Sequence, residues 1–363
     1  MFPDKIIQNR KKDGTAPLIV LSGPTAVGKT RLSIALAKAV DGEIVSADSM
    51  QVYRHMDIGS AKITEEEMQG VPHHMISVLD PWEDFSVAVF KEMCEICLQG
   101  IYERGHIPIL TGGTGFYVQA LLRDIDFSGS REETGLSAQT MGFSGSAGDR
   151  TADEKGRDIR SALEQAALEK GAAFLHRQLE QVDPLSAEMI HANNLKRTVR
   201  ALEYFYLTGE PISSHNKRER EKPSAYLSCY FVLNDIRERL YKRIELRVDQ
   251  MLEQGLVAEV EALRAMGCHR GMVSMQGLGY KEILAYLEGE MTLEEAVERI
   301  KRDTRHFAKR QLTWFRREQE VVWVNKNEFD YREERILEFM LARLGERGIS
   351  ADFPGDRFRK ESE

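Results

Sequence analysis

Eight residues near the N-terminus, Gly23 to Thr30 (GPTAVGKT), restrict the fold of this chain more than any other segment. They form a complete GxxxxGK[ST] pattern between the apolar run Pro17 to Ser22 and the amphipathic stretch Lys29 to Val40. The order strand, Gly-rich loop, helix is typical of phosphate-binding loops; an incidental Gly-rich turn is the alternative. We therefore expect an α/β fold with a P-loop NTPase-like parallel sheet flanked by helices.

The loop predicts a diphosphate or polyphosphate ligand. Its backbone N–H groups would turn toward phosphate oxygens, the Lys29 ammonium would neutralise their charge, and the Thr30 hydroxyl is suited to hold Mg²⁺. The expected ligand-binding residues are Gly23, Pro24, Thr25, Ala26, Val27, Gly28, Lys29 and Thr30.

Further strand-like runs lie on both sides of a segment unlike the rest of the chain. Glu43–Asp48 and Ile107–Gly112 precede it, and Cys229–Leu233 and Val321–Val324 follow it. Of the 29 residues from Ser128 to Gly156, six are glycine and five are serine, which predicts a flexible loop. We expect a flexible N-terminus at 1–16, a first core part at 17–126, a helical insertion at 127–207 with its loop at 128–156, a second core part with long helices at 208–330, and a C-terminal helix with a frayed tail at 331–363.

The charge is unevenly distributed. The whole chain has a formal net charge of -8, yet residues 299–317 contain eight basic residues and only one acid, Asp303. A local basic surface is compatible with a nucleic-acid partner. The basic residues are Arg299, Lys301, Arg302, Arg305, Lys309, Arg310, Arg316 and Arg317.

Two polar segments are expected at the same edge of the sheet as the phosphate loop. Asp48 ends the second strand-like run, and Thr111 to Gly115 (TGGTG) ends the third. Ligands in parallel α/β sheets bind at the carboxyl ends of strands, so Asp48 is a candidate general base, with a helix N-cap as the structural alternative. The Gly-rich segment alone is equally compatible with a tight turn. No apolar strand ends in the Asp expected of a hydrolytic Walker B site, which argues against a motor ATPase.

Two residue pairs invite a metal interpretation. His73 and His74 are adjacent, so their side chains diverge, and we favour a structural or lid role. Cys94 and Cys97 fall within Val87–Leu98, where apolar residues recur at helical spacing, and we interpret them as buried helix cysteines. We expect a cytoplasmic protein, because we find no leader-like or membrane-spanning segment and few cysteines.

Several blocks together resemble the bacterial tRNA dimethylallyltransferases. They are GPTAVGKT, ADSMQVYRHMDIGSAK, VPHHMI, DFSVAVF, IPILTGGTGFYVQALL, NNLKRTVRALEYF and GLGYKE, and the likeness runs from about Leu18 to Trp323. Two departures are a longer 128–156 segment and the presence of Gln276 and Lys281 where relatives often have arginine.

The resemblance implies transfer of a dimethylallyl group from its diphosphate to the exocyclic amine of the adenine 3′ of the anticodon, position 37, in tRNAs that read codons starting with U. It implies that Asp48 accepts the proton, that Lys29, Thr30 with Mg²⁺ and Arg237 hold the diphosphate, and that Thr25 lies near the reacting centre. The implied tRNA-facing residues are Asp48, Ser49, Met50, Gln51, Thr114, Arg160, Lys196, Arg197, Thr198, Val199, Arg200, Gln276, Gly277, Leu278, Gly279, Tyr280 and Lys281. We expect a monomer whose partners are dimethylallyl diphosphate and the anticodon stem-loop.

Three other functions share parts of this pattern. A small-molecule P-loop kinase would use the loop and Asp48 with a nucleoside triphosphate. A dimethylallyltransferase acting on free adenine nucleotides would need neither the helical insertion nor the basic segment. A nucleotide-dependent RNA-binding module would keep the basic surface without needing Asp48.

Overall fold

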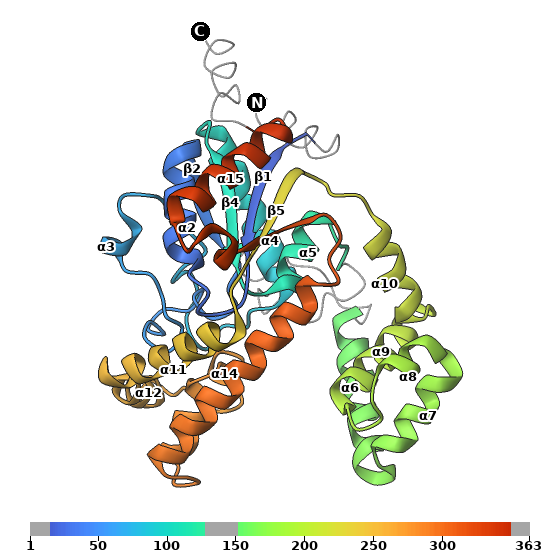
Figure 1. Cartoon of the computed structure of the whole chain (residues 1–363). Helices are drawn as coiled ribbons and strands as arrows, with labels where there is room; N and C mark the ends of the chain where they lie inside the picture. The colour runs from blue at the N-terminus through green and yellow to red at the C-terminus, as the bar shows by residue number, and fades with distance from the viewer. Residues whose placement is uncertain (1–14, 128–151, 350–363) are drawn as a thin grey trace, which may run out of the picture. The chain divides into compact units, whose positions relative to one another are not determined.

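The chain divides into two compact units (Figure 1). The first combines Met1–Leu122 with Ser224–Glu363, and the second is Arg123–Pro223. The computed structural model describes residues 15–127 and 152–349, and no side chains at 152–155 and 157. The expectations for the N-terminal tail, most of the 128–156 loop and the C-terminal tail fall outside these residues.

A parallel sheet forms the centre of the first unit. In its described part, six strands lie in the order β3-β2-β4-β1-β5-β6, and every pairing is parallel. Their bounds are β1 Pro17–Ser22, β2 Gly42–Ser46, β3 His73–His74, β4 Ile107–Gly112, β5 Leu227–Asn234 and β6 Val321–Asn325. The expected fold class is confirmed, and the core is built from both sides of the insertion.

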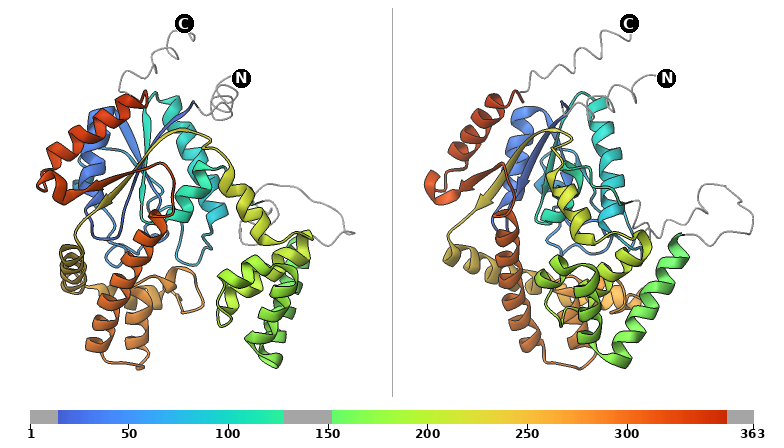
Figure 2. Two further views of the ribbon diagram at one scale, coloured as in Figure 1. Left: turned by 45° about the vertical axis from the view of Figure 1, so that its right-hand side comes forward. Right: turned by 90° about the vertical axis from the view of Figure 1, so that its right-hand side faces the viewer.

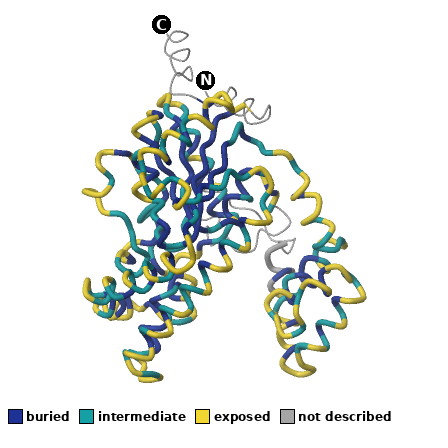
Figure 3. The backbone as a smooth tube through the Cα atoms, viewed as in Figure 1, coloured by how far each residue is buried: buried dark blue, intermediate teal, exposed yellow. Residues whose placement is uncertain are grey.

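Alternation along the strands produces two apolar cores. On β1, Ile19 and Leu21 pack into one core, whereas Leu18 and Val20 pack into the other. The first core is covered by α2 (Lys29–Val40) and α15 (Glu333–Glu346), the second by α4 (Val87–Glu103) and α5 (Gly115–Leu122). Both views in Figure 2 show these two layers, and the strands are the most buried part of the chain in Figure 3.

Most of the remaining helices of this unit follow β5. They are α11 (Arg237–Glu253), α12 (Leu256–Ala265), η3 (Ser274–Gln276), α13 (Tyr280–Leu287), α14 (Leu293–Phe315) and, after β6, η4 (Lys326–Phe329), whereas α3 (Glu65–Met68) lies between β2 and β3. Gly255 adopts φ 100° between α11 and α12 and so separates these two helices.

The second unit is a helical bundle with its own apolar core, which includes Leu175, Leu179 and Leu202. Its helices are α6 (Ala152–Lys170), α7 (Ala172–Val182), α8 (Pro184–Met189), α9 (Leu195–Thr208) and α10 (Ile212–Glu221). The unit extends to Pro223, so the boundary expected at 207 lies inside it.

Asp183 attaches α10 to this bundle. Its carboxylate is 1% exposed and accepts hydrogen bonds from the backbone and hydroxyl of Ser186 on α8 and of Ser213 on α10. Burial opposes ionisation, but the hydrogen bonds from both serines outweigh it and lower the pKa of Asp183. This network explains why α10 belongs to the bundle.

The two pairs considered as metal ligands have structural positions. His74 on the edge strand β3 donates from Nε2 to the Glu43 carboxylate of β2 at 2.6 Å, and His73 contacts the Val71 carbonyl. Cys94 and Cys97 lie on α4, where burial raises the pKa of the Cys97 thiol. In the described residues, no helix is long and apolar enough to cross a bilayer.

Replacing Asp183 by alanine should weaken the second unit by about 2–4 kcal/mol, because four donors lose a buried charged acceptor. Hydrogen exchange in α8 and α10 measures this, with the exposed Glu188→Ala on α8 as control. Because its pKa is lowered, the contribution of Asp183 should be present at neutral pH and lost below about pH 4. Unchanged protection in Asp183→Ala would contradict this role.

Candidate active site

The phosphate loop crosses the carboxyl ends of β1 and β5. Gly23 has φ 150°, and a Cβ there would lie 2.4 Å from the Leu233 carbonyl oxygen of β5. Ala26 and Gly28 also have positive φ, 62° and 98°. The glycines therefore let the backbone approach the sheet and turn sharply into α2.

The start of α2 is open to an anion. Gly28 is its N-cap, and no side chain caps the helix. The first N–H groups of a helix have no intrahelical partner and favour negative charge. The Lys29 ammonium bends back onto the loop, where it donates to the carbonyls of Gly23 and Pro24 at 3.0 Å each.

Three more cations, which the sequence did not single out, surround this loop. A Cβ on Gly28 would lie 3.3 Å from both the Arg243 guanidinium and the Lys326 ammonium. Lys326 is 6% exposed and donates to the Val27 carbonyl at 3.4 Å. Arg247, one turn beyond Arg243 on α11, is close enough to perturb Lys29.

Arg237, which the resemblance assigned to the diphosphate, begins α11 and is exposed. Its guanidinium donates to the Tyr241 hydroxyl at 3.1 Å and lies over that ring. Neither of these two contacts reaches the phosphate loop. Arg243 and Arg247, farther along the helix, occupy the position expected of Arg237.

Burial and mutual repulsion lower the pKa of three of the cations at this loop. Burial and the Arg247 charge lower the pKa of Lys29 to about 8, while Asp48 opposes the shift. Burial and the Arg243 charge also lower the pKa of Arg247 and of Lys326. A bound polyanion would relieve this repulsion.

Asp48 follows β2 at the same edge, where a turn and not a helix begins, so the alternative of a helix N-cap is wrong. Its Oδ1 accepts from the Met50 backbone at 2.8 Å and from the Gln51 backbone at 3.4 Å, which closes this turn. The half-buried carboxylate also interacts electrostatically with Lys29 and Arg247. Because the turn uses Oδ1, Oδ2 remains available for proton transfer in this geometry.

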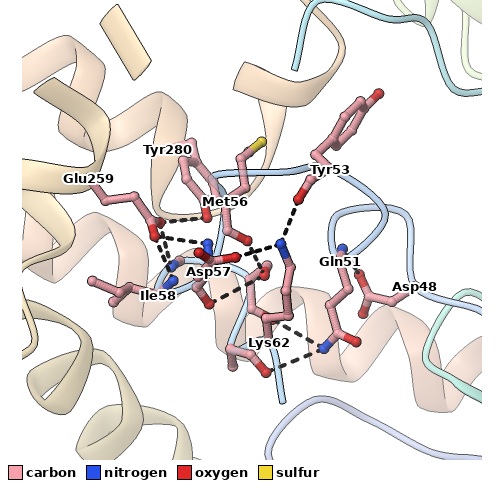
Figure 4. Close-up of polar contacts among 12 residues, drawn as sticks. Asp48, Gln51, Tyr53, Met56, Asp57, Ile58, Lys62, Glu259 and Tyr280 are labelled. Atoms are coloured by element: carbon pink, nitrogen blue, oxygen red, sulfur yellow. Dashed lines mark hydrogen bonds and ion pairs between the residues drawn. The ribbon is translucent and has the colours of Figure 1, made fainter. Parts of the chain in front are cut away.

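The loop that continues from Asp48 is held by polar contacts (Figure 4). Gln51 donates to the carbonyls of Ser60 and Ala61, and Lys62 donates to the carbonyl of Tyr53. Glu259 on α12 accepts from the backbone N–H groups of residues 57, 58 and 59, at 2.8, 2.7 and 3.0 Å. These contacts make the wall beside Asp48 a fixed structure.

The end of β4 forms another wall. A Cβ on Gly112 would lie 2.3 Å from the Ala47 carbonyl oxygen, so the segments carrying Thr114 and Asp48 pass in direct contact. Thr114 is half-buried, and its carbonyl accepts from Tyr117 and Val118 at the start of α5. The TGGTG segment therefore belongs to the same edge as the phosphate loop.

The GLGYKE block packs beneath this edge, which corrects part of the expected RNA surface. Tyr280 is completely buried and donates its hydroxyl to Glu259 at 2.8 Å, so its side chain is unavailable to RNA. Gly277 lies against Met50, where a Cβ would meet Met50 Cε at 2.5 Å. Gln276 stays exposed and donates to the Arg270 carbonyl, and Lys281 pairs with Glu282 at 3.5 Å. Gly279 and the half-buried Leu278 join these residues.

The block 196–200 of the helical unit likewise contains both buried and exposed side chains. Thr198 and Val199 are 0% and 4% exposed, so their side chains face the bundle and not a partner. Arg200 contacts the completely buried Glu203 at 3.2 Å, as Arg160 does at 2.9 Å. Lys196 and Arg197 are exposed and have no ion-pair partner among the described residues.

The basic helix α14 is also partly neutralised. Lys301 pairs with Asp249 and Arg305 with Glu245, each at 2.7 Å, and Arg302 pairs with Asp303 at 2.8 Å. In the described chain, the basic residues of 299–317 without an ion-pair partner are Arg299, Lys309, Arg310, Arg316 and Arg317.

The donor set suits Mg²⁺ bound through its ligand. Thr30 is exposed at the mouth of the loop, and the described residues contain no group of three or more His, Cys, Asp or Glu side chains arranged around a metal. Mg²⁺ commonly uses one or two protein oxygens together with phosphate oxygens and waters. The residues therefore fit a diphosphate-bound cation and not an all-protein cage.

The lowered pKa of Lys29 predicts how inorganic diphosphate binds. The protonated amine binds the anion better, so affinity should fall as pH rises above about 8, by up to about tenfold per pH unit. Calorimetric titrations between pH 7 and 10 measure this. Lys29→Met, which has no titrating group, is the control, since the titration of diphosphate itself is common to both proteins. Parallel profiles for the two proteins would contradict the prediction.

Comparisons with known proteins agree on one family. A family model described as IPP transferase matches residues 51–318, and one described as isopentenyl transferase matches residues 16–77. A tRNA dimethylallyltransferase of Lachnoclostridium phytofermentans is 54% identical over 333 residues, covering 92% of this chain and 99% of that protein. The enzyme of the same name from Acetivibrio thermocellus is 47% identical over 330 residues, covering 90% and 98%.

Solved structures of the same kind are similar. The tRNA isopentenylpyrophosphate transferase of Bacillus halodurans has a TM-score of 0.63 at 43% identity, covering 92% of this chain and 98% of its own. A eukaryotic dimethylallyltransferase acting on tRNA has a TM-score of 0.69 at 29% identity, covering 86% and 74%. With a cation-lined phosphate loop beside a strand-end aspartate, this chain belongs to the tRNA dimethylallyltransferase family.

Proposed function

We propose that this protein transfers the dimethylallyl group of dimethylallyl diphosphate to the exocyclic amine of adenine 37 in tRNAs that read codons starting with U, and releases diphosphate. The observation that carries the proposal is the pairing of a cation-lined phosphate loop with Asp48 at the adjoining edge of the sheet. The names of the relatives, which are tRNA dimethylallyltransferases, support the same reaction.

The chemistry needs both parts of the site. The amine is a weak nucleophile because its lone pair is delocalised into the adenine ring, so a base must accept its proton. Asp48 takes this role through Oδ2. As the C–O bond to the diphosphate breaks, the departing charge is stabilised by Lys29, Arg243 and Arg247, with Thr25 beside the reacting carbon.

We assign Mg²⁺ as the metal that accompanies the diphosphate. The Thr30 hydroxyl would hold it, and it would supply charge neutralisation to the leaving group. The contribution of the chain itself is the open start of α2 and the ammonium of Lys29, which bind the same oxygens.

The acceptor base must leave its stack to reach Asp48. We assign the pocket to Asp48, Ser49, Met50, Gln51 and Thr114, which lie at the ends of β2 and β4. In the helical unit, the exposed Lys196 and Arg197 are the candidate phosphate contacts. Arg160 and Arg200 also touch Glu203, so they hold the bundle together whether or not they reach RNA. We expect a cytoplasmic monomer, which light scattering with and without tRNA would test.

The alternative functions are not favoured. The relatives carry a prenyltransferase name and not a kinase name, which weighs against phosphate transfer to a small molecule. Prenylation of free adenine nucleotides would require neither the helical unit nor the cations of α14. A non-catalytic RNA-binding module would not need Asp48 beside the phosphate loop.

Incubation with Mg²⁺, labelled dimethylallyl diphosphate and unmodified tRNA with adenines at positions 36 to 38 tests the reaction. Label should appear on adenine 37 alone, with one diphosphate released per transfer. Free adenosine monophosphate is the control acceptor. Labelling of that nucleotide in preference to tRNA, or phosphate transfer from ATP, would contradict the proposal.

Asp48→Asn should lower turnover by about 10² to 10⁴ while tRNA binding is retained. The amide oxygen can still accept from Met50 and Gln51, so the loop keeps its shape while the proton acceptor is lost. Asp57→Asn, an exposed aspartate of the same loop, is the matched control. Single-turnover rates measure both. Retention of more than about a tenth of wild-type turnover in Asp48→Asn would remove the base assignment.

A further inference from the structure

Gln311 on α14 joins the phosphate loop to the turn after β4. Its side chain is 7% exposed, far inside a helix whose outer face is charged. The amide oxygen accepts from the Thr25 backbone N–H at 2.9 Å. The amide nitrogen donates to the Gly113 carbonyl at 2.9 Å. One residue, distant in sequence, thus bridges two segments of the site.

An uncharged amide is the group that this position requires. It must accept at one end and donate at the other, because its partners are an N–H and a C=O. An ionised carboxylate would repel the Gly113 carbonyl, and a methionine would leave both partners unsatisfied. The chemistry of the two backbone groups therefore also fixes which way the amide points.

The absence of a side chain at Gly113 leaves room for the Gln311 amide. A Cβ on Gly113 would lie 2.2 Å from Gln311 Nε2, so no larger residue fits there without moving the amide. Gly113 does not need a positive φ, which leaves close approach as the reason for glycine.

The amide is not required to dock its helix. Ile300 and Phe315 on α14 are 2% and 0% exposed in one core, and Ala308 is 0% exposed in the other. These apolar contacts hold α14 against the sheet on both sides of Gln311. The two hydrogen bonds of Gln311 are therefore not needed to dock α14, and their effect is on the two segments that they join.

We propose that Gln311 is a positioning residue that sets the spacing between the donor and the acceptor in prenyl transfer, and this rests on the function proposed above. Thr25 belongs to the loop that holds the diphosphate, and Gly113 precedes Thr114 in the wall of the base pocket. By holding both backbones, Gln311 aligns the reacting carbon with the amine. Loss of this alignment should lower turnover more than it lowers ligand affinity, because displacements of about 1 Å cost up to about 10²-fold in rate.

Gln311→Met removes both hydrogen bonds and keeps a similar volume. We expect kcat to fall by about 10- to 100-fold, with less than about threefold change in the affinity for inorganic diphosphate and in the KM for dimethylallyl diphosphate. The matched control is Gln250→Met, the same exchange at an exposed position of α11. A kcat within threefold of wild type, or an equal loss of diphosphate affinity, would overturn the proposal.

Gln311→Glu gives a second test through pH. The protonated acid can accept from Thr25 and donate to Gly113, as the amide does, whereas the ionised form cannot donate. Its rate relative to wild type should rise by about tenfold or more as pH falls from 8.5 to 6, because burial raises the pKa of a carboxyl group. A constant ratio would overturn the proposal even if Gln311→Met failed to fold.

The experiments distinguish failure of the positioning role of Gln311 from failure of the proposed function. Absence of prenyl transfer in the wild-type protein would reject that function. Normal transfer in wild type and equal transfer in Gln311→Met would reject only the positioning role. Diphosphate affinity is measured without any turnover, so it remains an independent readout in every variant.

Discussion

The candidate active site depends on the convergence of several cations on the phosphate loop. Lys29, Arg243, Arg247 and Lys326 converge on one loop, and burial together with neighbouring cations lowers the pKa of Lys29, Arg247 and Lys326. Such an arrangement is unfavourable unless a polyanion occupies it. The surrounding sheet, with its buried strands and well-packed helices, supplies the rigidity that keeps the cations together.

Asp48 has its place within the same field. It is the carboxylate that opposes the lowering of the Lys29 pKa, and its Oδ1 also accepts hydrogen bonds from the backbone of its own loop. No helix starts after Asp48, so its carboxylate closes a turn instead of capping a helix. The turn fixes the carboxylate in place, and the contacts of Glu259 and Gln51 fix the rest of its loop.

Buried polar contacts also decide which charged residues remain for RNA. In the helical unit, Glu203 has no exposed surface and engages both Arg160 and Arg200, whereas Lys196 and Arg197 stay exposed. On α14, three of the basic residues are paired with carboxylates. Exposed ion pairs contribute little to stability, but they reduce the positive charge that a phosphate backbone would meet.

Local pattern determined much of the fold. The strands Pro17–Ser22 and Ile107–Gly112 and the helix Lys29–Val40 have the bounds that the sequence predicts, because the strands are short buried runs and the helix buries one apolar face. The phosphate loop could also be predicted from a local pattern, because the eight residues that form it are consecutive in the sequence. Lys326, Arg243 and Gln311 reach the loop across about 200 to 300 residues, and no local pattern marks them. Likewise, burial of Tyr280, Thr198 and Val199, and the attachment of α10 through Asp183, depend on which helices pack together. Sequence by itself therefore determined the sheet and the loop, whereas tertiary packing decided which distant side chains complete the site.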